Sequence, residues 1–518
     1  MSHTTITFLV LAAVVVAFVS DRLPVAIVAV GTALALWATG VLDLHQALAG
    51  FGDPAVLFIA SLFVVSESLD ATGVTAWVGQ ELIARVHDSR TRLMVFTLLL
   101  VAGLSALISV NGSVAALVPV GVVMAIRLRY PPSQLLLPLA FAAHAGSLLT
   151  LSGSPVNVVA SEFAKNAGVG SFGYFSFALV GIPLVVGTIV FVVAFGERLL
   201  PTRLASSGSR DFGAHARTLI EQYGLDADTE LLSRRSGVAE VVIPPRSELV
   251  GDSVFPGMVT ESGDLVVLAV QRHGEELPGK TTLAVGDTVL LRGTWGALEE
   301  RLDDGEVLVV DRPDVVRRHI PLGIGARRAL LVLTAMVVLL ATGAVPPAVA
   351  GLLAAMALVV SRVLTMEQAY RGVSWTTVVL VAGMIPLSTA MTMTGAAQRL
   401  ADALVDTVGG AGPYALLAGL FLLTAVLGQL ISNMATALIV FPVALEAAQD
   451  LHVSARPVLM CVTVAAAAAL ITHVATPANL MVMEPGGYRF SDYWKLGLPL
   501  LVLYGAVAVG LVPVFWRL

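Results

Sequence analysis

Residues 42–57, LDLHQALAGFGDPAVL, recur in the second half of the chain as residues 364–379, LTMEQAYRGVSWTTVV, with five identities in sixteen aligned positions. Further identities keep the same spacing, within one residue, as far as Asn157 and Asn479. A register that holds over about 115 residues indicates an internal duplication. The matching pairs are Leu42/Leu364, Gln46/Gln368, Ala47/Ala369, Gly50/Gly372, Val56/Val378, Ser66/Ser388, Thr72/Thr394, Gly73/Gly395, Ser109/Ser432, Pro119/Pro442, Pro155/Pro477 and Asn157/Asn479.

The composition excludes a water-soluble protein. Of the 518 residues, 57% are hydrophobic and 13% are charged, whereas soluble domains carry about 25% charged residues. The single cysteine, Cys461, excludes a disulfide scaffold. A formal charge of −6 without a basic run argues against nucleic acid as a partner. These observations leave a multi-pass membrane protein whose environment is the lipid bilayer.

Each half contains five apolar runs long enough to cross a bilayer and one longer stretch with a polar interruption. The interrupted stretches, 93–126 and 413–447, predict helical hairpins that either cross twice or re-enter from one side. Broken helices persist in lipid only where protein or a water-filled cavity receives them. The runs are 5–20, 24–41, 54–72, 134–161 and 174–197, then 328–343, 346–363, 374–393, 455–482 and 494–516.

The distribution of basic residues predicts the orientation. Five crossings plus a hairpin place the second copy upside down relative to the first. With both termini outside, the cytoplasmic loops carry sixteen Lys and Arg apart from residues 205–316, and the outside loops carry four. The sequence therefore predicts a protein of the cell (inner) membrane. Inverted repeats with discontinuous helices are typical of secondary transporters, and we favour this class over a channel or a membrane enzyme.

The predicted fold is an all-α polytopic membrane protein of two inverted repeats, 1–200 and 325–518, each with five crossings, a hairpin and a broken helix. Between them, residues 201–236 read as a linker and 237–316 as a small α+β domain in the cytoplasm. Residues 205–316 hold 20 of the 36 acidic residues. Alternating apolar residues predict strands at 238–243, 265–270, 288–292 and 307–310.

Each repeat supplies two polar motifs: SVNGS (109–113) and SGSPVN (152–157), then SNMAT (432–436) and ATPAN (475–479). Proline breaks the helical ladder and frees carbonyl groups, and Ser, Thr and Asn add neutral oxygens that suit Na⁺. Exposed helix N-termini suit an anion. The motifs contain no lysine or arginine, so co-bound cations are the expected counter-charge. The alternative is that small polar residues only allow close helix packing.

These motifs, together with residues 475–497 (ATPANLMVMEPGGYRFSDYWKLG), resemble the divalent anion:Na⁺ symporter family of the ion transporter superfamily. The resemblance covers both membrane halves. It implies an elevator-type carrier rather than an enzyme, a homodimer with a scaffold domain and a moving domain, and Na⁺ as coupling ion without another cofactor.

The resemblance also implies a set of site residues. One Na⁺ site would take Ser109, Asn111, Gly153 and Asn157, and the other Ser432, Asn433, Ala475 and Asn479. A small anionic substrate would lie between the hairpin tips, among Asn111, Gly112, Ser113, Ser154, Pro155, Asn433, Met434, Thr436, Thr476, Pro477 and His473. Dicarboxylate carriers of the family have Ser-Asn-Thr at both tips, whereas this chain has SVN and SNM. Dicarboxylate, citrate and sulfate therefore all stay open as substrates.

Five ionisable residues lie in or beside apolar runs, where such groups are functional by default: Glu67, Asp70, His144, His473 and Glu484. We expect Asp70 to be solvated, His144 to be a hydrogen-bonded packing residue, and His473 to contact substrate or relay a proton. An ion exchanger of the sodium/proton type would need Glu67 or His473 as its titratable group. An arsenite-like oxyanion exporter and a non-transporting sensor are further alternatives.

The insert resembles the TrkA C-terminal (RCK-C) domain. The similarity rests on SELVG (247–251), VQRHG (270–274) and VGDTV (285–289). The resemblance implies a dimerisation module that binds a small regulatory ligand, and a passive module is the alternative.

Overall fold

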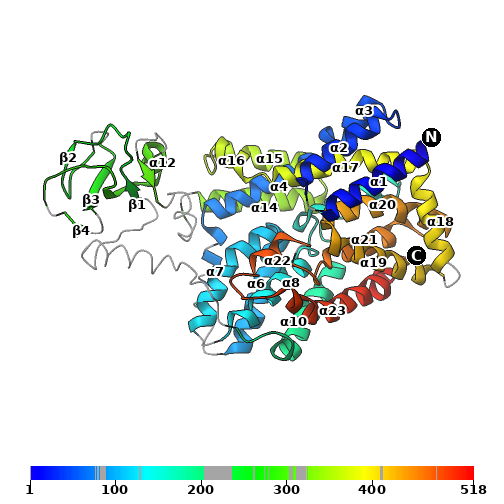
Figure 1. The fold of residues 1–518 in the computed structure, drawn as a ribbon. Coiled ribbons are helices and arrows are strands. Elements are labelled where there is room, and N and C mark those ends of the chain that lie inside the picture. Colours follow the sequence, from blue (N-terminus) through cyan, green and yellow to red (C-terminus); the bar gives the residue numbers. More distant parts are fainter. Residues whose placement is uncertain are drawn as a thin grey trace.

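The computed structural model describes residues 2–20, 22–75, 77–78, 81, 89–127, 130–203, 236–260, 263–272, 275–277, 279–302, 307–310, 323, 325–408, 412–473 and 475–518. The chain is mostly helical with a small sheet region (Figure 1). Seven helices among the described residues are long and apolar enough to cross a membrane. Nearly all of the predicted linker, residues 204–235, lies outside the described part of the chain, as do residues 273–274 of the VQRHG motif.

The helices recur in the same order in the two halves, and most of the corresponding starts keep the spacing of the sequence repeat to within one residue. The first half contains α1 (His3–Ser20), α2 (Val25–Ala38), α3 (Leu44–Leu48), α4 (Pro54–Ala71), α6 (Arg90–Leu107), α7 (Val110–Arg127), α8 (Leu136–Gly146), α9 (Pro155–Asn166) and α10 (Ala178–Leu199). The second contains α14 (Ala326–Thr342), α15 (Pro347–Val360), α16 (Met366–Gly372), α17 (Trp375–Met393), α18 (Ala396–Val408), α19 (Pro413–Leu430), α20 (Asn433–Asp450), α21 (Ala455–Ala467), α22 (Pro477–Met481), α23 (Phe490–Ala506) and α24 (Val512–Phe515). The helices around the polar motifs keep this spacing: α6 and α19 start 323 residues apart, α7 and α20 323, and α9 and α22 322. The starts of α8 and α21 are 319 residues apart, and those of α10 and α23 are 312 apart.

The recurrence of one glutamine in both halves has a local structural explanation. Gln46 and Gln368 are the third residues of the short helices α3 and α16, which the apolar runs did not predict. Each glutamine forms a capping box with the residue before its helix, Asp43 and Thr365 respectively. The backbone N–H of Gln46 donates to Asp43 Oδ1 at 2.7 Å, and that of Gln368 donates to Thr365 Oγ1 at 3.1 Å. Such reciprocal bonds satisfy amides that a helix start leaves unpaired.

The helix interruptions lie where the polar motifs predicted them. Helix α6 ends just before Ser109 and α19 just before Ser432, and each serine accepts a hydrogen bond from an amide in the first turn of the next helix. Between α8 and α9, and again between α21 and α22, the helical ladder stops. Pro155 and Pro477 begin the helices beyond these breaks, the position where a missing N–H costs nothing.

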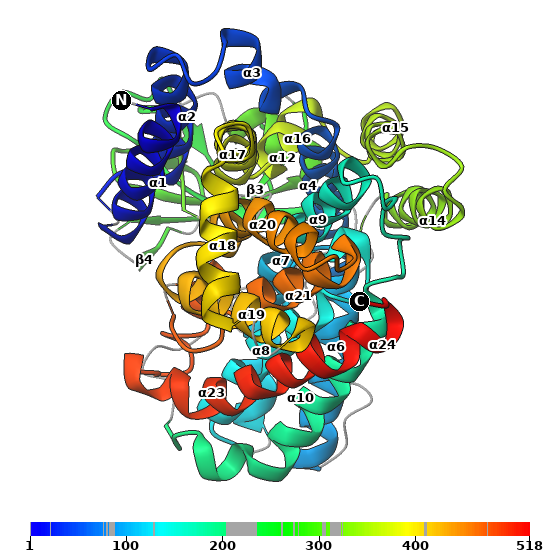
Figure 2. The same ribbon diagram turned by 90° about the vertical axis from the view of Figure 1, so that its right-hand side faces the viewer.

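The helices pack as two groups, which touch where α17 meets α20 (Figures 1 and 2). The α4–α17 group contains α1, α2, α4, α14, α15 and α17, and the α8–α21 group contains α6, α7, α8, α9, α10, α19, α20, α21, α22 and α23. A Cβ atom on Gly383 of α17 would lie 2.6 Å from the Ala29 backbone of α2. A Cβ atom on Gly146 of α8 would lie 2.3 Å from Ala102 of α6. Among the described glycines, no approach closer than 3.0 Å joins one group to the other.

The insert forms a sheet with its own apolar core. The sheet order is β4-β3-β6-β1-β7, with β1 (Ser236–Val242), β3 (Leu265–Arg272), β4 (Glu275–Glu276), β6 (Thr288–Thr294) and β7 (Leu308–Val309). Strands β2 (Ser253–Val254) and β5 (Thr281–Thr282) pair separately, and α12 (Trp295–Leu302) packs on β1 and β6. All four predicted strands are present. Both chain termini lie on the side of the helical body away from this sheet (Figure 1).

Candidate ion and substrate site

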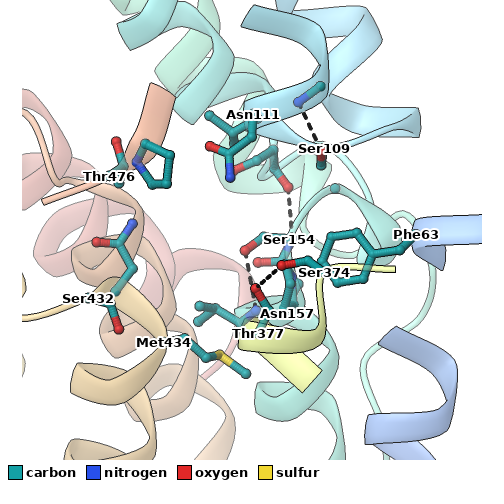
Figure 3. A pocket seen from close by; sticks show the side chains of 18 of the residues that line it. Phe63, Ser109, Asn111, Ser154, Asn157, Ser374, Thr377, Ser432, Met434 and Thr476 are labelled. Atoms are coloured by element: carbon teal, nitrogen blue, oxygen red, sulfur yellow. Dashed lines mark hydrogen bonds between the residues drawn. The ribbon is translucent and has the colours of Figure 1, made fainter. Parts of the chain in front are cut away.

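The four polar motifs meet at one cavity of about 500 Å³ in the helical body (Figure 3). It lies where the hairpin tips of both halves face the two helix breaks. Thirteen of the predicted site residues line it: Ser109, Asn111, Gly112, Gly153, Ser154, Pro155, Asn157, Ser432, Asn433, Met434, Ala475, Thr476 and Pro477. Segments from opposite halves of the sequence thus contribute to one site.

The opposite wall comes from α4 and α17, which carry none of the four motifs. Phe63, Glu67 and Asp70 of α4 face this cavity, together with Ser374 and Thr377 at the start of α17. The two hydroxyl groups of Ser374 and Thr377 are 2.9 Å apart (Figure 3). Sequence reasoning missed these last two residues, although the polar run SWTT (374–377) at the start of an apolar segment was a signal for them.

The cavity extends toward the side of the body where the chain returns from the insert. Asp70 lies in the last turn of α4, and the amide of Gly323 donates to the Thr72 carbonyl oxygen at 2.8 Å. The end of α4 is therefore next to Gly323, which precedes α14.

The charge of the cavity is neutral to acidic. Among the described lining residues there is no lysine or arginine, and Glu67 and Asp70 are the acidic members. Gly372 makes room for Glu67, since a Cβ at this glycine would lie 2.5 Å from that of Glu67. An anion in this cavity would need positive charge from a source other than basic side chains.

Helix N-termini supply part of that positive charge. Helices α7, α9 and α20 all begin at the cavity, at Val110, Pro155 and Asn433. Ser154 caps the start of α9, and Ser432 caps the start of α20. The unpaired amides and the positive dipole ends of such helices favour anions.

One asparagine side chain forms hydrogen bonds across each helix break, in the same way in both halves. The side-chain NH₂ group donates to the carbonyl oxygens of the residues ten and seven positions earlier. Both asparagines are fully buried, so these bonds satisfy carbonyl groups that the broken ladder leaves unpaired. The bonds run from Asn157 to Ser147 (2.8 Å) and Thr150 (2.8 Å), and from Asn479 to Ala469 (2.8 Å) and Thr472 (3.0 Å).

The side-chain oxygens of Asn157 and Asn433 are buried and have no hydrogen-bond partner among the described residues. A buried oxygen without a donor is costly, and hard cations prefer such oxygen ligands. Both residues belong to the predicted Na⁺ sets, so the donor chemistry fits a cation at each. In contrast, Asn479 Oδ1 lies 3.3 Å from His144 Nε2. His144 is thus buried and hydrogen-bonded in the cavity wall.

Four predicted site residues lie outside the described cavity lining: Ser113, Thr436, His473 and Asn479. Ser113 bonds to Ser105 and to the Val110 carbonyl, and Thr436 is buried within α20. The His473 ring packs edge-on against Phe490, with ring centroids 5.4 Å apart. Glu484, in the turn after α22, is likewise not among these lining residues.

Broken helices around a polar cavity, in a chain with several membrane-spanning helices, define a multi-pass membrane transporter. The family profile of citrate transporters (CitMHS) matches residues 15–458 and 413–518. The chain belongs to this citrate transporter family, which is related to sodium/sulfate cotransporters.

Individual relatives agree with this assignment. An uncharacterized transporter of Escherichia coli (strain K12), YfbS, is 30% identical over 98% of each chain. The probable sodium/sulfate cotransporter 3 of Chlamydomonas reinhardtii is 27% identical over 56% of this chain and 33% of its own. The YdaH transporter structure from Alcanivorax borkumensis superposes with a TM-score of 0.51 at 14% identity, covering 93% of this chain and 89% of that chain. This last similarity shows a shared fold.

Proposed function

We propose that the protein is a secondary active transporter that couples Na⁺ to the symport of a small divalent anion. One observation carries the proposal: the motifs of both halves meet at a cavity with donor-free amide oxygens and no described lysine or arginine. Cations would bind first at the amide oxygens. Their charge, with three helix N-termini, would then hold the anion.

The anion would be of the dicarboxylate, citrate or sulfate type. The citrate family profile and the sodium/sulfate cotransporters among the relatives both support this range. Val110 and Met434 bring apolar groups to the tips, so fewer donors are available for carboxylates. Na⁺ would use the two residue sets predicted from the sequence, and the substrate would lie between the tips.

We further propose that the halves are inverted repeats and that the α8–α21 group moves past the α4–α17 group as an elevator. The equal spacing of α6, α7 and α9 from their counterparts supports the repeat. Movement of one group requires a boundary without interlocked backbones. The closest approaches at the described glycines all lie within one group or the other, and this supports such a boundary. The homodimer remains an expectation from the family resemblance.

The insert would lie in the cytoplasm, with both termini outside. The cavity would then be open toward the cytoplasm in this conformation, because it reaches the end of α4 beside Gly323. A ligand-binding TrkA-C-type role for the insert is part of the same proposal. Uptake that survives deletion of 205–316 would argue against the sensor alternative.

Proteoliposomes test the coupling. Uptake of labelled sulfate, succinate and citrate is measured with an inward Na⁺ gradient and with choline in its place. We expect accumulation of at least one anion with Na⁺, strong loss in choline, and loss in N157A. T334A, whose hydroxyl donates to Leu330 within α14, is the matched control. Uptake at full rate without Na⁺ would refute the coupling.

A second candidate, a cation/proton exchanger, is favoured by the acidic residues Glu67 and Asp70 in the cavity wall. E67Q would then abolish exchange driven by a pH gradient when no anionic substrate is present. A symporter would show no such exchange.

A further inference from the structure

His144 makes the two halves of the cavity unequal. This histidine lies thirteen positions before Asn157, and the residue at the same offset before Asn479 is Ala466. Both His144 and Ala466 line the cavity, from the corresponding helices α8 and α21. The duplicated framework therefore presents an imidazole on one side and a methyl group on the other.

The orientation of the Asn479 amide is fixed by its own hydrogen bonds. Both hydrogens of its NH₂ group are used by the carbonyl oxygens of Ala469 and Thr472. Its Oδ1 atom can only accept, so His144 Nε2, 3.3 Å away, must carry a hydrogen and donate. The Thr476 hydroxyl oxygen lies 3.2 Å from the same nitrogen. An N–H group thus points at the oxygen atoms of the second break.

Among the residues that the structure describes, no such donor is present at the first break. Asn157 is held by the same two bonds, yet its Oδ1 is buried without a partner among the described residues. Its side chain is 0% exposed, compared with 2% for His144. The same ligand atom is therefore open in one half and occupied by an N–H group in the other.

We propose that His144 is a specificity-determining residue that takes the place of a cation at the second break, so that Na⁺ binds tightly only at Asn157. The inference rests on the proposed Na⁺-coupled function and deepens it. An N–H donor at the Asn479 oxygen repels a cation that approaches the same oxygen, because both present positive charge to it and to each other. Asn433 Oδ1 alone would leave the second site weak.

The test is Na⁺ binding to the purified full-length protein, measured by equilibrium binding of labelled Na⁺ and by calorimetry. We expect wild type to bind a single Na⁺ tightly. H144A, which gives the first half the alanine of the second, is expected to gain a second tight Na⁺. The reciprocal A466H places an imidazole opposite Asn157 and is expected to weaken the remaining site by about tenfold or more.

Two controls keep the result interpretable. H144Q retains an amide donor for Asn479 and is expected to stay at a single Na⁺, while size-exclusion profiles report folding. Two tight Na⁺ ions in wild type, or an unchanged count in a folded H144A together with an unchanged affinity in A466H, would overturn the inference and leave Na⁺ coupling intact. No Na⁺ binding by any variant would overturn the proposed function as well.

Discussion

Arg203, the last described residue before the insert, forms an ion pair of 2.7 Å with Asp492 of the second membrane half. The carboxylate is 3% exposed and also accepts from the Arg489 amide at 2.8 Å. The same guanidinium donates to the Gly487 carbonyl oxygen at 2.8 Å. The end of the first half is thereby fastened to the start of α23.

Removing this arginine should destabilise the protein. R203A leaves Asp492 buried with the Arg489 amide and Lys495 as remaining partners. We expect a loss of roughly 2 kcal/mol in the free energy of unfolding, less than the about 3–5 kcal/mol of a fully buried pair because Arg203 is 33% exposed. The loss is measured as a lower thermal unfolding midpoint in detergent. R198A removes an exposed arginine from the last turn of α10 and serves as control. Equal midpoints for R203A and wild type would show that the pair adds nothing.

Alanine substitution of the two break asparagines should lower the stability of the protein by similar amounts but change its response to Na⁺ differently. N157A and N479A each remove two hydrogen bonds from buried carbonyl groups, so each should lose about 2 kcal/mol. The rise of the unfolding midpoint on adding Na⁺ should disappear in N157A and persist in N479A. Loss of the Na⁺ response in both variants would instead support two equivalent sites.

The hairpin tips should control which anion is carried. M434T introduces a hydroxyl donor into the cavity wall at the tip of the second hairpin. One added hydrogen bond is worth about 1 kcal/mol, so KM for succinate relative to sulfate should fall by about fivefold. M434L, which adds no donor, is the matched control. A similar change in both variants would assign the effect to side-chain volume.

Fixing the two helix groups to each other should stop transport. Thr392 of α17 and Gln449 of α20 are exposed and line a second cavity. This cavity lies at the start of α4, whereas Asp70 lies at its end. Helix α20 packs on α21 and so belongs to the α8–α21 group. In T392C/Q449C, a short bifunctional thiol reagent should block uptake, while each single cysteine variant keeps it. R328C/S361C joins α14 to the end of α15 within one group and should leave uptake unchanged under the same reagent. Full uptake by crosslinked T392C/Q449C would contradict the elevator.

Patterns with a local physical cause were predictable from the sequence. Pro155 and Pro477 cannot continue a helix, so the breaks were visible without any structure. The strands of the insert follow from alternating residues such as those of 265–270, because a half-buried strand has a period of two. The hairpin interruptions at Ser109 and Ser432 likewise coincide with helix starts.

What depends on distant contacts was not predictable. No pattern near His144 indicates that its ring meets Asn479, 335 residues later. His473 sits beside a break in the sequence, yet its ring packs on Phe490 instead of lining the described cavity. Ser374 and Thr377 reach the cavity only because α17 packs against the side of the body that carries the motifs. Proximity along the chain was a poor guide to proximity in space for each of these residues.

Asn157 and Asn479 each stabilise a helix break through the nitrogen of a side-chain amide. The oxygen of the same amide contacts His144 in Asn479 and is the proposed Na⁺ ligand in Asn157. One planar amide group therefore has both a structural role at the helix break and a binding role at the cavity. An ion that coordinates the oxygen would rotate the amide plane. This rotation would change the hydrogen bonds from the amide nitrogen to the two backbone carbonyl groups. A substitution that changes the ion affinity at this position therefore also changes the stability of the helix break. A substitution that destabilises the break likewise changes the ion affinity.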